Sequence, residues 1–458
     1  MYSTINDKLN ALSWAIAALL LLPFLFTKGM FFDGLTYATV ARNLNDGLGS
    51  WWAPHYTSTI HPVFYEHPPF SFWLHSLFYR LFGDQVWVDR FYAYTLYGVS
   101  VLLIRRIWAL LIPAAHRSWI PQLIWTVTPT VIWVHHNNML EAPLAAATLT
   151  TTWLLIESTM KRNYFWAFLG GIALFISVGI KGPVGLFPLV VLPVFAVLFP
   201  EHRRASLSSL FAMVLSFSAV FAAFYTLEPG FKALFEGYLD RQLVPTLLGK
   251  REHHGSAWTS LLEVGKQLAL PVVVLTVLAL RRKKGYPLRR ESLLFFIIAL
   301  SATLPFFFMD RQHHYYFMPA MVYWIMGFAM LYEQAPWPWQ VARKKWAVRL
   351  SYINLMAWVV AIGLSIYFSK SPMRDKGWIR TVEQLKADDV HRLGVYPLSD
   401  YWREAAMAAR YGKITLEEST QSTYLLLPAT QPAPVGYSEV ETHKRLKKLK
   451  VYKLDTAN

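Results

Sequence analysis

The sequence predicts an all-α polytopic membrane protein with about 11 transmembrane helices, followed by a small α/β domain outside the bilayer. Hydrophobic residues make up 55% of the 458 positions and charged residues only 16%, whereas about 25% of an average soluble domain is charged. The apolar residues are gathered into runs of about 20, the length that crosses a bilayer core as a helix. Composition and run length together exclude a soluble globular protein.

The expected spans follow one another along the chain, separated by polar loops. The first apolar run continues through "LLPFLFTKGMFF" without a small-residue cleavage site, so we expect an uncleaved first span rather than a signal peptide. Lys181-Gly182-Pro183 interrupts a long apolar stretch and divides it into two spans. The expected spans cover residues 11–28, 91–112, 119–135, 140–158, 164–180, 183–199, 206–226, 260–280, 292–309, 316–332 and 346–368.

Lysine and arginine concentrate in alternate loops, which predicts the orientation. The basic loops are 105–117, 161–162, 203–204, 281–290 and 343–345. Because cytoplasmic loops are enriched in these residues, we expect the basic loops and the N-terminus in the cytoplasm. The loops 29–89 and 227–258 and the tail 371–458 are then extracytoplasmic. Contact with anionic membrane lipids explains the net charge of +16 better than nucleic acid does. The absence of cysteine excludes disulfides and thiolate chemistry.

The outer segments carry structure of their own. Apolar residues three apart predict a helix over 34–46, and "PFSFWLHSLFYRLF" predicts an aromatic helix over 69–82 that starts at a proline. We expect both to lie in the plane of the membrane surface. In 371–458, "HRLGVYPL", "STYLLLPA" and "KVYKLD" resemble strands, while "WIRTVEQLKA" and "YWREAAMAARY" resemble helices. The chain therefore divides into a membrane domain, 1–370, and a soluble α/β domain, 371–458.

Acidic residues mark the outer side of the predicted bundle. Asp33 in "FFDG" has two interpretations: an N-cap for the helix that follows, or a general base or metal ligand at the mouth of the bundle. Glu66 and His67 precede two prolines in "FYEHPP", and Glu141 follows a second span in "HHNNMLEAP". Ionisable residues at membrane depth mark functional sites by default. Asp33 and Glu141 are candidates to share a hard cation such as Mg²⁺ or Mn²⁺, and a zinc site built on "HH" and Glu141 is a weaker alternative.

Basic and aromatic residues accumulate on the same side. Lys181 interrupts an apolar stretch, where a lysine is costly unless it is paired, binds an anion or extends to the interface. The turn "DRQHHYYFMP" and the loop 227–258 add residues suited to phosphate, although tyrosine there also fits an aromatic belt. These phosphate-binding candidates are Arg241, Arg251, Arg311, His314 and Tyr316. We expect the loop 227–258 to act as a mobile cover.

Acids and cations on one face suit a transferase with a membrane-anchored phosphate-ester donor. A carboxylate deprotonates the acceptor hydroxyl, and cations neutralise the departing phosphate. The sequence contains no Walker loop and no Rossmann glycine pattern. We therefore expect a lipid-linked sugar, rather than a nucleotide sugar, as the donor.

Five ordered motifs resemble the polyprenyl-phosphate-sugar-dependent glycosyltransferases of the GT-C fold, which include protein O-mannosyltransferases and the lipid A aminoarabinose transferase. The motifs are "DGLTYATVARNL", "FYEHPPFSFWLHSLFYRLFG", "NNMLEAPLAA", "VGIKGPVGL" and "RQHHYYFMP", and they lie within residues 10–335. The resemblance implies that Asp33 is the catalytic acid/base or a ligand of a catalytic metal, with Glu66 and Glu141 as acidic companions. It implies that Lys181 and Tyr316 contact the lipid phosphate.

Two positions depart from the family pattern. Gly34 stands where relatives often have a second acid. His67, a further candidate for binding the lipid phosphate, stands where they often have lysine. The resemblance implies an inverting transferase of the bacterial inner membrane that moves a hexosyl or pentosyl group from polyprenyl phosphate to a lipid, glycan or protein hydroxyl. The alternatives are a lipid-linked sugar flippase, which needs polar residues through the bilayer, and a non-catalytic glycolipid-binding subunit.

Overall fold

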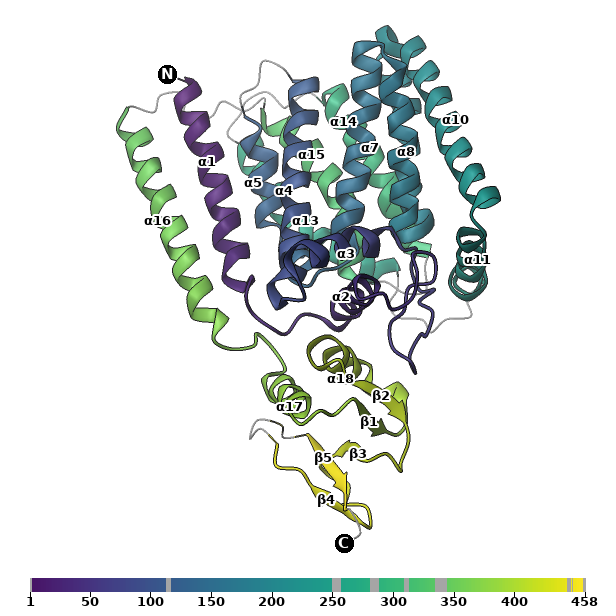
Figure 1. Cartoon of the computed structure of the whole chain (residues 1–458). Helices are drawn as coiled ribbons and strands as arrows, with labels where there is room; N and C mark the ends of the chain where they lie inside the picture. The colour runs from purple at the N-terminus through teal and green to yellow at the C-terminus, as the bar shows by residue number, and fades with distance from the viewer. Residues whose placement is uncertain are drawn as a thin grey trace.

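The computed structural model describes residues 2–112, 117–248, 257–280, 288–308, 313–333, 344–442, 446 and 448–455. It shows a bundle of helices with a small sheet-containing domain at one end (Figure 1). The bundle helices are α1 (Tyr2–Leu21), α4 (Val86–Leu111), α5 (Trp119–Val127), α6 (Pro129–His136), α7 (Glu141–Lys161), α8 (Tyr164–Lys181), α9 (Val191–Leu198), α10 (Arg203–Leu227), α13 (Ala257–Leu280), α14 (Arg290–Thr303), α15 (Met318–Glu333) and α16 (Lys344–Ser369).

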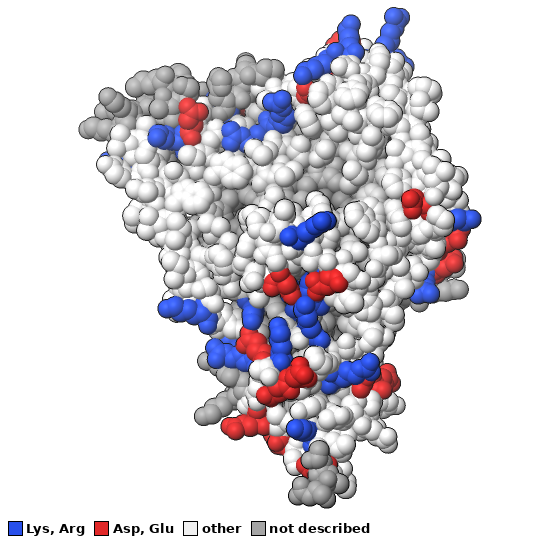
Figure 2. Space-filling view, viewed as in Figure 1, with Lys and Arg blue, Asp and Glu red and all other residues white. Residues whose placement is uncertain are grey.

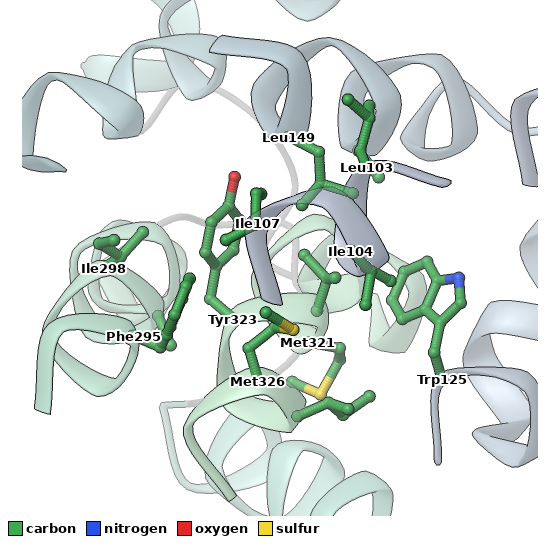
Figure 3. Close-up of a cluster of buried hydrophobic side chains, with 14 of the residues drawn as sticks. Leu103, Ile104, Ile107, Trp125, Leu149, Phe295, Ile298, Met321, Tyr323 and Met326 are labelled. Atoms are coloured by element: carbon green, nitrogen blue, oxygen red, sulfur yellow. The ribbon is translucent and has the colours of Figure 1, made fainter. Parts of the chain in front are cut away.

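A continuous apolar core joins these helices. Figure 3 shows Leu103, Ile104 and Ile107 of α4 with Trp125 of α5, Leu149 of α7, Phe295 and Ile298 of α14, and Met321, Tyr323 and Met326 of α15. The buried Tyr323 hydroxyl lies 2.9 Å from the Thr152 hydroxyl and is satisfied by it. Close side-chain packing of this kind holds helices together where lipid replaces water.

Within the described residues, six helical segments are long and apolar enough to cross a membrane. They are Ile5–Phe24, Val86–Leu111, Tyr164–Leu198, Pro200–Leu227, Arg290–Phe307 and Trp346–Ser369. The α6–α7 pair, bent by 115°, makes a seventh if it counts as one span. The expected number of 11 is therefore not confirmed. The span expected over 119–135 is broken at Thr128, whose extended backbone precedes Pro129, because a residue before proline is disfavoured in the helical region.

The apolar stretch Tyr164–Leu198 folds back on itself. Helix α8 ends at Lys181, and Gly182 has φ +71°, a conformation that favours glycine. A 3₁₀ segment, Gly182–Val190, follows. A Cβ on Gly185 would lie 2.5 Å from the Ser177 carbonyl carbon, so the returning chain runs directly against α8. The break expected at Lys181-Gly182-Pro183 is present, and it leaves Lys181 at a helix end.

Two helices of the loop 29–89, α2 (Phe32–Asn45) and α3 (Phe70–Phe82), lie at the end of the bundle that meets the C-terminal domain (Figure 1). Their limits agree with the expected ranges within two residues. The N-cap interpretation of Asp33 is wrong, however, because α2 begins earlier. Phe31 is the N-cap, and Asp33 lies inside the first turn, where the helix dipole favours a carboxylate.

The C-terminal domain contains α17 (Lys376–Ala387), α18 (Trp402–Met407) and a five-stranded sheet of order β2-β1-β3-β5-β4. The strands are β1 (Arg392–Val395), β2 (Thr415–Glu418), β3 (Tyr424–Pro428), β4 (Tyr437–Glu439) and β5 (Leu449–Leu454). Strand β1 pairs in parallel with β2 and β3, whereas β5 pairs antiparallel with β3 and β4. The sequence analysis did not predict β2 and β4, the two edge strands, which are four and three residues long.

Charge is distributed along the long axis of the molecule. Figure 2 shows lysine and arginine gathered at the end of the bundle opposite the C-terminal domain, then a band with few charges, then both signs on that domain. The N-terminus lies at the basic end (Figure 1). A band with few charges fits a multi-pass membrane protein. Which end is cytoplasmic stays a prediction from the basic loops.

Candidate active site

A cavity of about 1190 Å³ lies where the bundle, the outer loops and the C-terminal domain meet. Five of the residues singled out in the sequence line it: Asp33, Glu66, His67, Lys181 and Tyr316. They come from four separate stretches of the chain, so only folding brings them together. The apolar part of the wall comes from the 3₁₀ segment after α8 and from the segment Leu304–Phe308 after α14.

The start of α2 is held by the turn between α6 and α7. The Phe31 N–H donates to Asn137 Oδ1 at 2.7 Å, and Asn138 Nδ2 donates to the Gly34 carbonyl at 3.2 Å. A Cβ on Gly34 would lie 1.7 Å from the Asn137 carbonyl oxygen. Position 34 therefore has no room for any side chain, and glycine permits the close approach of the α6–α7 turn to α2.

Asp33 projects from the first turn of α2 into the cavity. The Tyr315 hydroxyl donates a hydrogen bond of 3.4 Å to Asp33 Oδ2. Burial raises the pKa of Tyr315 most, and electrostatic interaction with Tyr316 and Asp33 raises it further. Tyr315 therefore stays a neutral hydrogen-bond donor. Its ring stacks on Trp133, with centroids 5.0 Å apart. The carboxylate is thus held by a donor that is itself fixed by packing.

Lys181, which lines the cavity, forms an ion pair with Glu141, which is outside the described lining. Glu141 is the first residue of α7, and its side chain is 1% exposed, while that of Lys181 is 13% exposed. The ammonium also lies 4.4 Å from the Tyr316 ring centroid, a cation–π distance. Among the described residues, nothing bonds to the second carboxylate oxygen, Glu141 Oε2, although it is buried. Glu141 Oε2 can therefore accept a further hydrogen bond.

His67 and Glu66 lie at the loop that leads into α3. The His67 Nε2 atom is 3.2 Å from the Tyr37 hydroxyl. Tyr37 is one helical turn after Asp33 on the same face of α2, and burial, followed by Asp33 and Glu141, raises the pKa of its hydroxyl. Tyr37 was missed from the sequence, although the four-residue spacing from Asp33 was a signal for it.

The remaining predicted phosphate-binding residues are placed differently. Arg241 packs over the Tyr65 ring at 4.8 Å and is outside the described lining of the cavity. His314 lies 5.0 Å from the Trp133 ring, and burial lowers the pKa of His314, so it is neutral near pH 7. Arg251 and Arg311 lie outside the described residues. Within the cover expected over 227–258, residues 229–247 form helices α11 (Pro229–Tyr238) and α12 (Val244–Leu247), joined by a π-helical turn, and residues 249–256 lie outside the described part of the chain.

The residues proposed as metal ligands have other partners. His135 Nδ1 lies 2.7 Å from the Val131 carbonyl, and His136 Nε2 lies 2.9 Å from the Leu20 carbonyl. Glu141 is paired with Lys181, a cation that would repel a metal ion. In the part of the chain that the structure describes, no three His, Asp or Glu side chains are grouped to hold a metal. The observed set does not fit the predicted Mg²⁺ or Mn²⁺, and no reaction step is assigned to one.

Comparisons with known proteins identify the fold. A family model described as dolichyl-phosphate-mannose-protein mannosyltransferase matches residues 66–227. The crystal structure of ArnT from Cupriavidus metallidurans bound to undecaprenyl phosphate superposes with a TM-score of 0.68 at 16% identity, covering 96% of this chain and 97% of that chain. Its apo state gives 0.59 at 15% identity, covering 89% and 85%. A search of curated proteins finds no match.

These findings confirm the resemblance stated from the motifs. At such low identity the structural likeness shows the fold, and this chain has the GT-C fold of ArnT. The matched family model begins at Glu66 and contains Glu141 and Lys181. Together they support a membrane glycosyltransferase.

Proposed function

We propose that this chain, with its GT-C fold, transfers a sugar from polyprenyl phosphate to an acceptor hydroxyl on the extracytoplasmic side, with inversion at the anomeric carbon. The observation that carries the proposal is the placement of one carboxylate, Asp33, and one cation, Lys181, on the wall of a single cavity. ArnT, the structural neighbour, was crystallised with undecaprenyl phosphate, which supports a polyprenyl phosphate as the lipid carrier here.

In the proposed reaction, Asp33 acts on the acceptor and Lys181 acts on the departing phosphate. The acceptor oxygen forms a bond to the anomeric carbon while the bond from that carbon to the phosphate oxygen breaks, and the electron pair leaves with the phosphate. Asp33 takes the acceptor proton as general base. Lys181 neutralises the charge that develops on the phosphate. Attack opposite to the leaving group inverts the anomeric centre.

Glu141 has a supporting role in this scheme. Its ion pair fixes the Lys181 ammonium beside Tyr316, so the cation is preorganised before the lipid phosphate arrives. Glu66 and His67 line the same cavity and remain candidates for contact with the sugar or the acceptor. Leu186, Phe187 and Phe306 provide an apolar wall suited to the prenyl chain.

Substitutions of Asp33 and Lys181 test sugar transfer and lipid-phosphate binding separately. We expect Asp33→Asn to lower transfer in proteoliposomes by roughly 10²-fold or more, because general bases contribute about 10²–10⁴-fold, with undecaprenyl phosphate binding preserved. Lys181→Met, in contrast, should weaken that binding roughly tenfold or more, since it removes a charge-assisted contact.

The matched control is Lys266→Met, which removes a lysine that is largely exposed and paired with Glu263 on α13. It should leave transfer and binding near wild-type values. Undiminished transfer by Asp33→Asn would contradict the role assigned to Asp33. A wild-type protein that binds the lipid phosphate but transfers no sugar would favour the transporter or binding-subunit alternatives.

A further inference from the structure

The C-terminal domain contributes an aromatic side chain to the cavity. Trp402, the first residue of α18, is the only residue of that domain in the described lining. It is 46% exposed, whereas a tryptophan that served only to dock the domain would be covered. A half-exposed indole on a cavity wall offers a flat apolar surface to a ligand.

A second ring from the first outer loop accompanies Trp402. The His61 and Trp402 rings are nearly parallel, with centroids 6.1 Å apart and an interplanar angle of 22°. His61 also lines the cavity. Its φ of 51° lies in the left-handed region, which is uncommon for a residue other than glycine and concentrates at functional sites.

The two rings are held across the junction between loop and domain. The Tyr56 N–H donates to the His61 carbonyl at 3.3 Å. The Thr59 hydroxyl donates to the Leu416 carbonyl of β2 at 2.5 Å, which ties the loop to the domain that carries Trp402. The aromatic pair is therefore a preformed platform made by two separate parts of the chain.

Chains of contacts link Asp33 both to this platform and to the cation. On one side, the Thr36 hydroxyl, one turn after Asp33, reaches the Tyr56 hydroxyl at 3.5 Å, and Tyr56 belongs to the loop that holds His61. On the other side, Tyr315 donates to Asp33 and packs against Tyr316, which lies under Lys181. The platform, the proposed base and the proposed phosphate-binding cation thus line one cavity and are joined through these contacts.

We propose that Trp402 and His61 form the acceptor subsite and stack on a sugar ring, so that the acceptor is a saccharide whose hydroxyl is brought to Asp33. A sugar ring presents C–H groups to an aromatic face and hydroxyls at its edge, and Glu66 and His67 on the cavity wall are suited to bond those hydroxyls. Lys181 is the only Lys or Arg in the described lining, so no second cation favours an anionic acceptor at the platform. This inference rests on the proposed function, and it names the acceptor class for that site.

Saturation-transfer difference NMR on the full-length protein in nanodiscs tests the platform directly. The probes are cellobiose, maltose and chitobiose. We expect saturation of their ring C–H protons by the wild type, a loss of roughly tenfold or more in affinity for Trp402→Ala, and retention by Trp402→Phe. Trp51→Ala is the matched control, because Trp51 is 58% exposed but lies outside the described lining, and it should bind the probes normally.

A transfer assay distinguishes failure of this inference from failure of the proposed function. With the best-bound disaccharide as acceptor, Trp402→Ala should raise the acceptor KM roughly tenfold and leave undecaprenyl phosphate binding unchanged. The inference is overturned if Asp33→Asn abolishes transfer while Trp402→Ala binds and uses saccharides as the wild type does. It is also overturned if a serine or threonine peptide is the acceptor and Trp402→Ala leaves its KM unchanged. If Asp33→Asn transfers normally, the role of Asp33 as base fails. If the wild type transfers no sugar, the proposed function fails, and the NMR result alone decides whether the platform binds sugar.

Discussion

At the residue scale, Gly34 shows how a single missing side chain shapes the site. The turn at Asn137 and Asn138 approaches α2 so closely that even a methyl group at position 34 would meet a backbone oxygen at 1.7 Å. The same turn bonds the Phe31 N–H. Glycine therefore allows the contact that positions Asp33, its immediate neighbour.

We expect Gly34→Ala to lower both transfer activity and the thermal midpoint of unfolding, because backbone atoms cannot move aside as a flexible side chain can. Overpacking of this kind costs about 1–3 kcal/mol. Gly98→Ala is the matched control, since Gly98 lies within α4 and a Cβ there meets nothing within 4 Å. If the two variants unfold at the same temperature and have equal activity, the close approach is not what position 34 requires.

At the element scale, the reversal at Gly182 decides where the cation lies. An uninterrupted helix over Tyr164–Leu198 would carry Lys181 at its middle, surrounded by lipid or core. The turn instead ends α8 at Lys181 and brings the 3₁₀ segment Gly182–Val190 back against the last turns of that helix. Lys181 consequently reaches Glu141 at the start of α7.

Helix α3 provides a pH-dependent prediction. His75 is buried between Tyr79 and Tyr92, with ring centroids 4.8 and 4.3 Å away, and burial lowers its pKa to about 3. In the unfolded chain a histidine has a pKa of about 6.5, so between pH 6.5 and about 3 only the unfolded state is protonated there. The free energy of unfolding should therefore fall as the pH drops below 6.5.

We expect His75→Phe to lose less thermal stability than the wild type between pH 7.5 and pH 5, because phenylalanine keeps the stacking and cannot take a proton. His391→Gln, at an exposed position of the C-terminal domain, is the control and should follow the wild-type slope. A wild-type slope in His75→Phe would show that other groups govern the acid response.

At the scale of the whole molecule, one buried arginine joins the C-terminal domain to the bundle. Arg410 bonds both carboxylate oxygens of Asp89 on α4 at 3.0 Å and Asp84 at 2.8 Å. Arg42 of α2 in turn donates to the carbonyls of Ala409 and Arg410, at 3.0 and 3.3 Å. This docking keeps Trp402 at the cavity.

We expect Arg410→Met to destabilise the protein by about 3–5 kcal/mol, because it leaves the fully buried Asp89 charge uncompensated. Lys413→Met is the control: Lys413 is half exposed and pairs with Asp46 at 3.1 Å, an interaction worth about 1 kcal/mol at most. Thermal unfolding in detergent and proteolysis at the C-terminal domain measure both. A change no larger for Arg410→Met than for Lys413→Met would show that the domain is held by its apolar contacts alone.

Hydropathy, spacing and ordered motifs were sufficient to predict a helical membrane protein, its outer helices and the central strands of its sheet. These properties depend on residues that are close together in the sequence, so they can be predicted from the sequence alone. The same is true of Asp33, Glu66, His67, Lys181 and Tyr316, which the sequence marked as unusual and which line one cavity.

Only the tertiary structure decided what these residues contact. It pairs Lys181 with Glu141, 40 residues apart in sequence. It leaves no room for a side chain at position 34, and it brings Trp402 to the cavity that Asp33 also lines. No periodicity encodes such contacts, because they depend on the turn at Gly182 and on the docking of a separate domain through Arg410. The physical reason is that a site is defined by distances in space. Those distances follow from packing between segments that are far apart in the sequence, and the local pattern of one segment does not depend on the other.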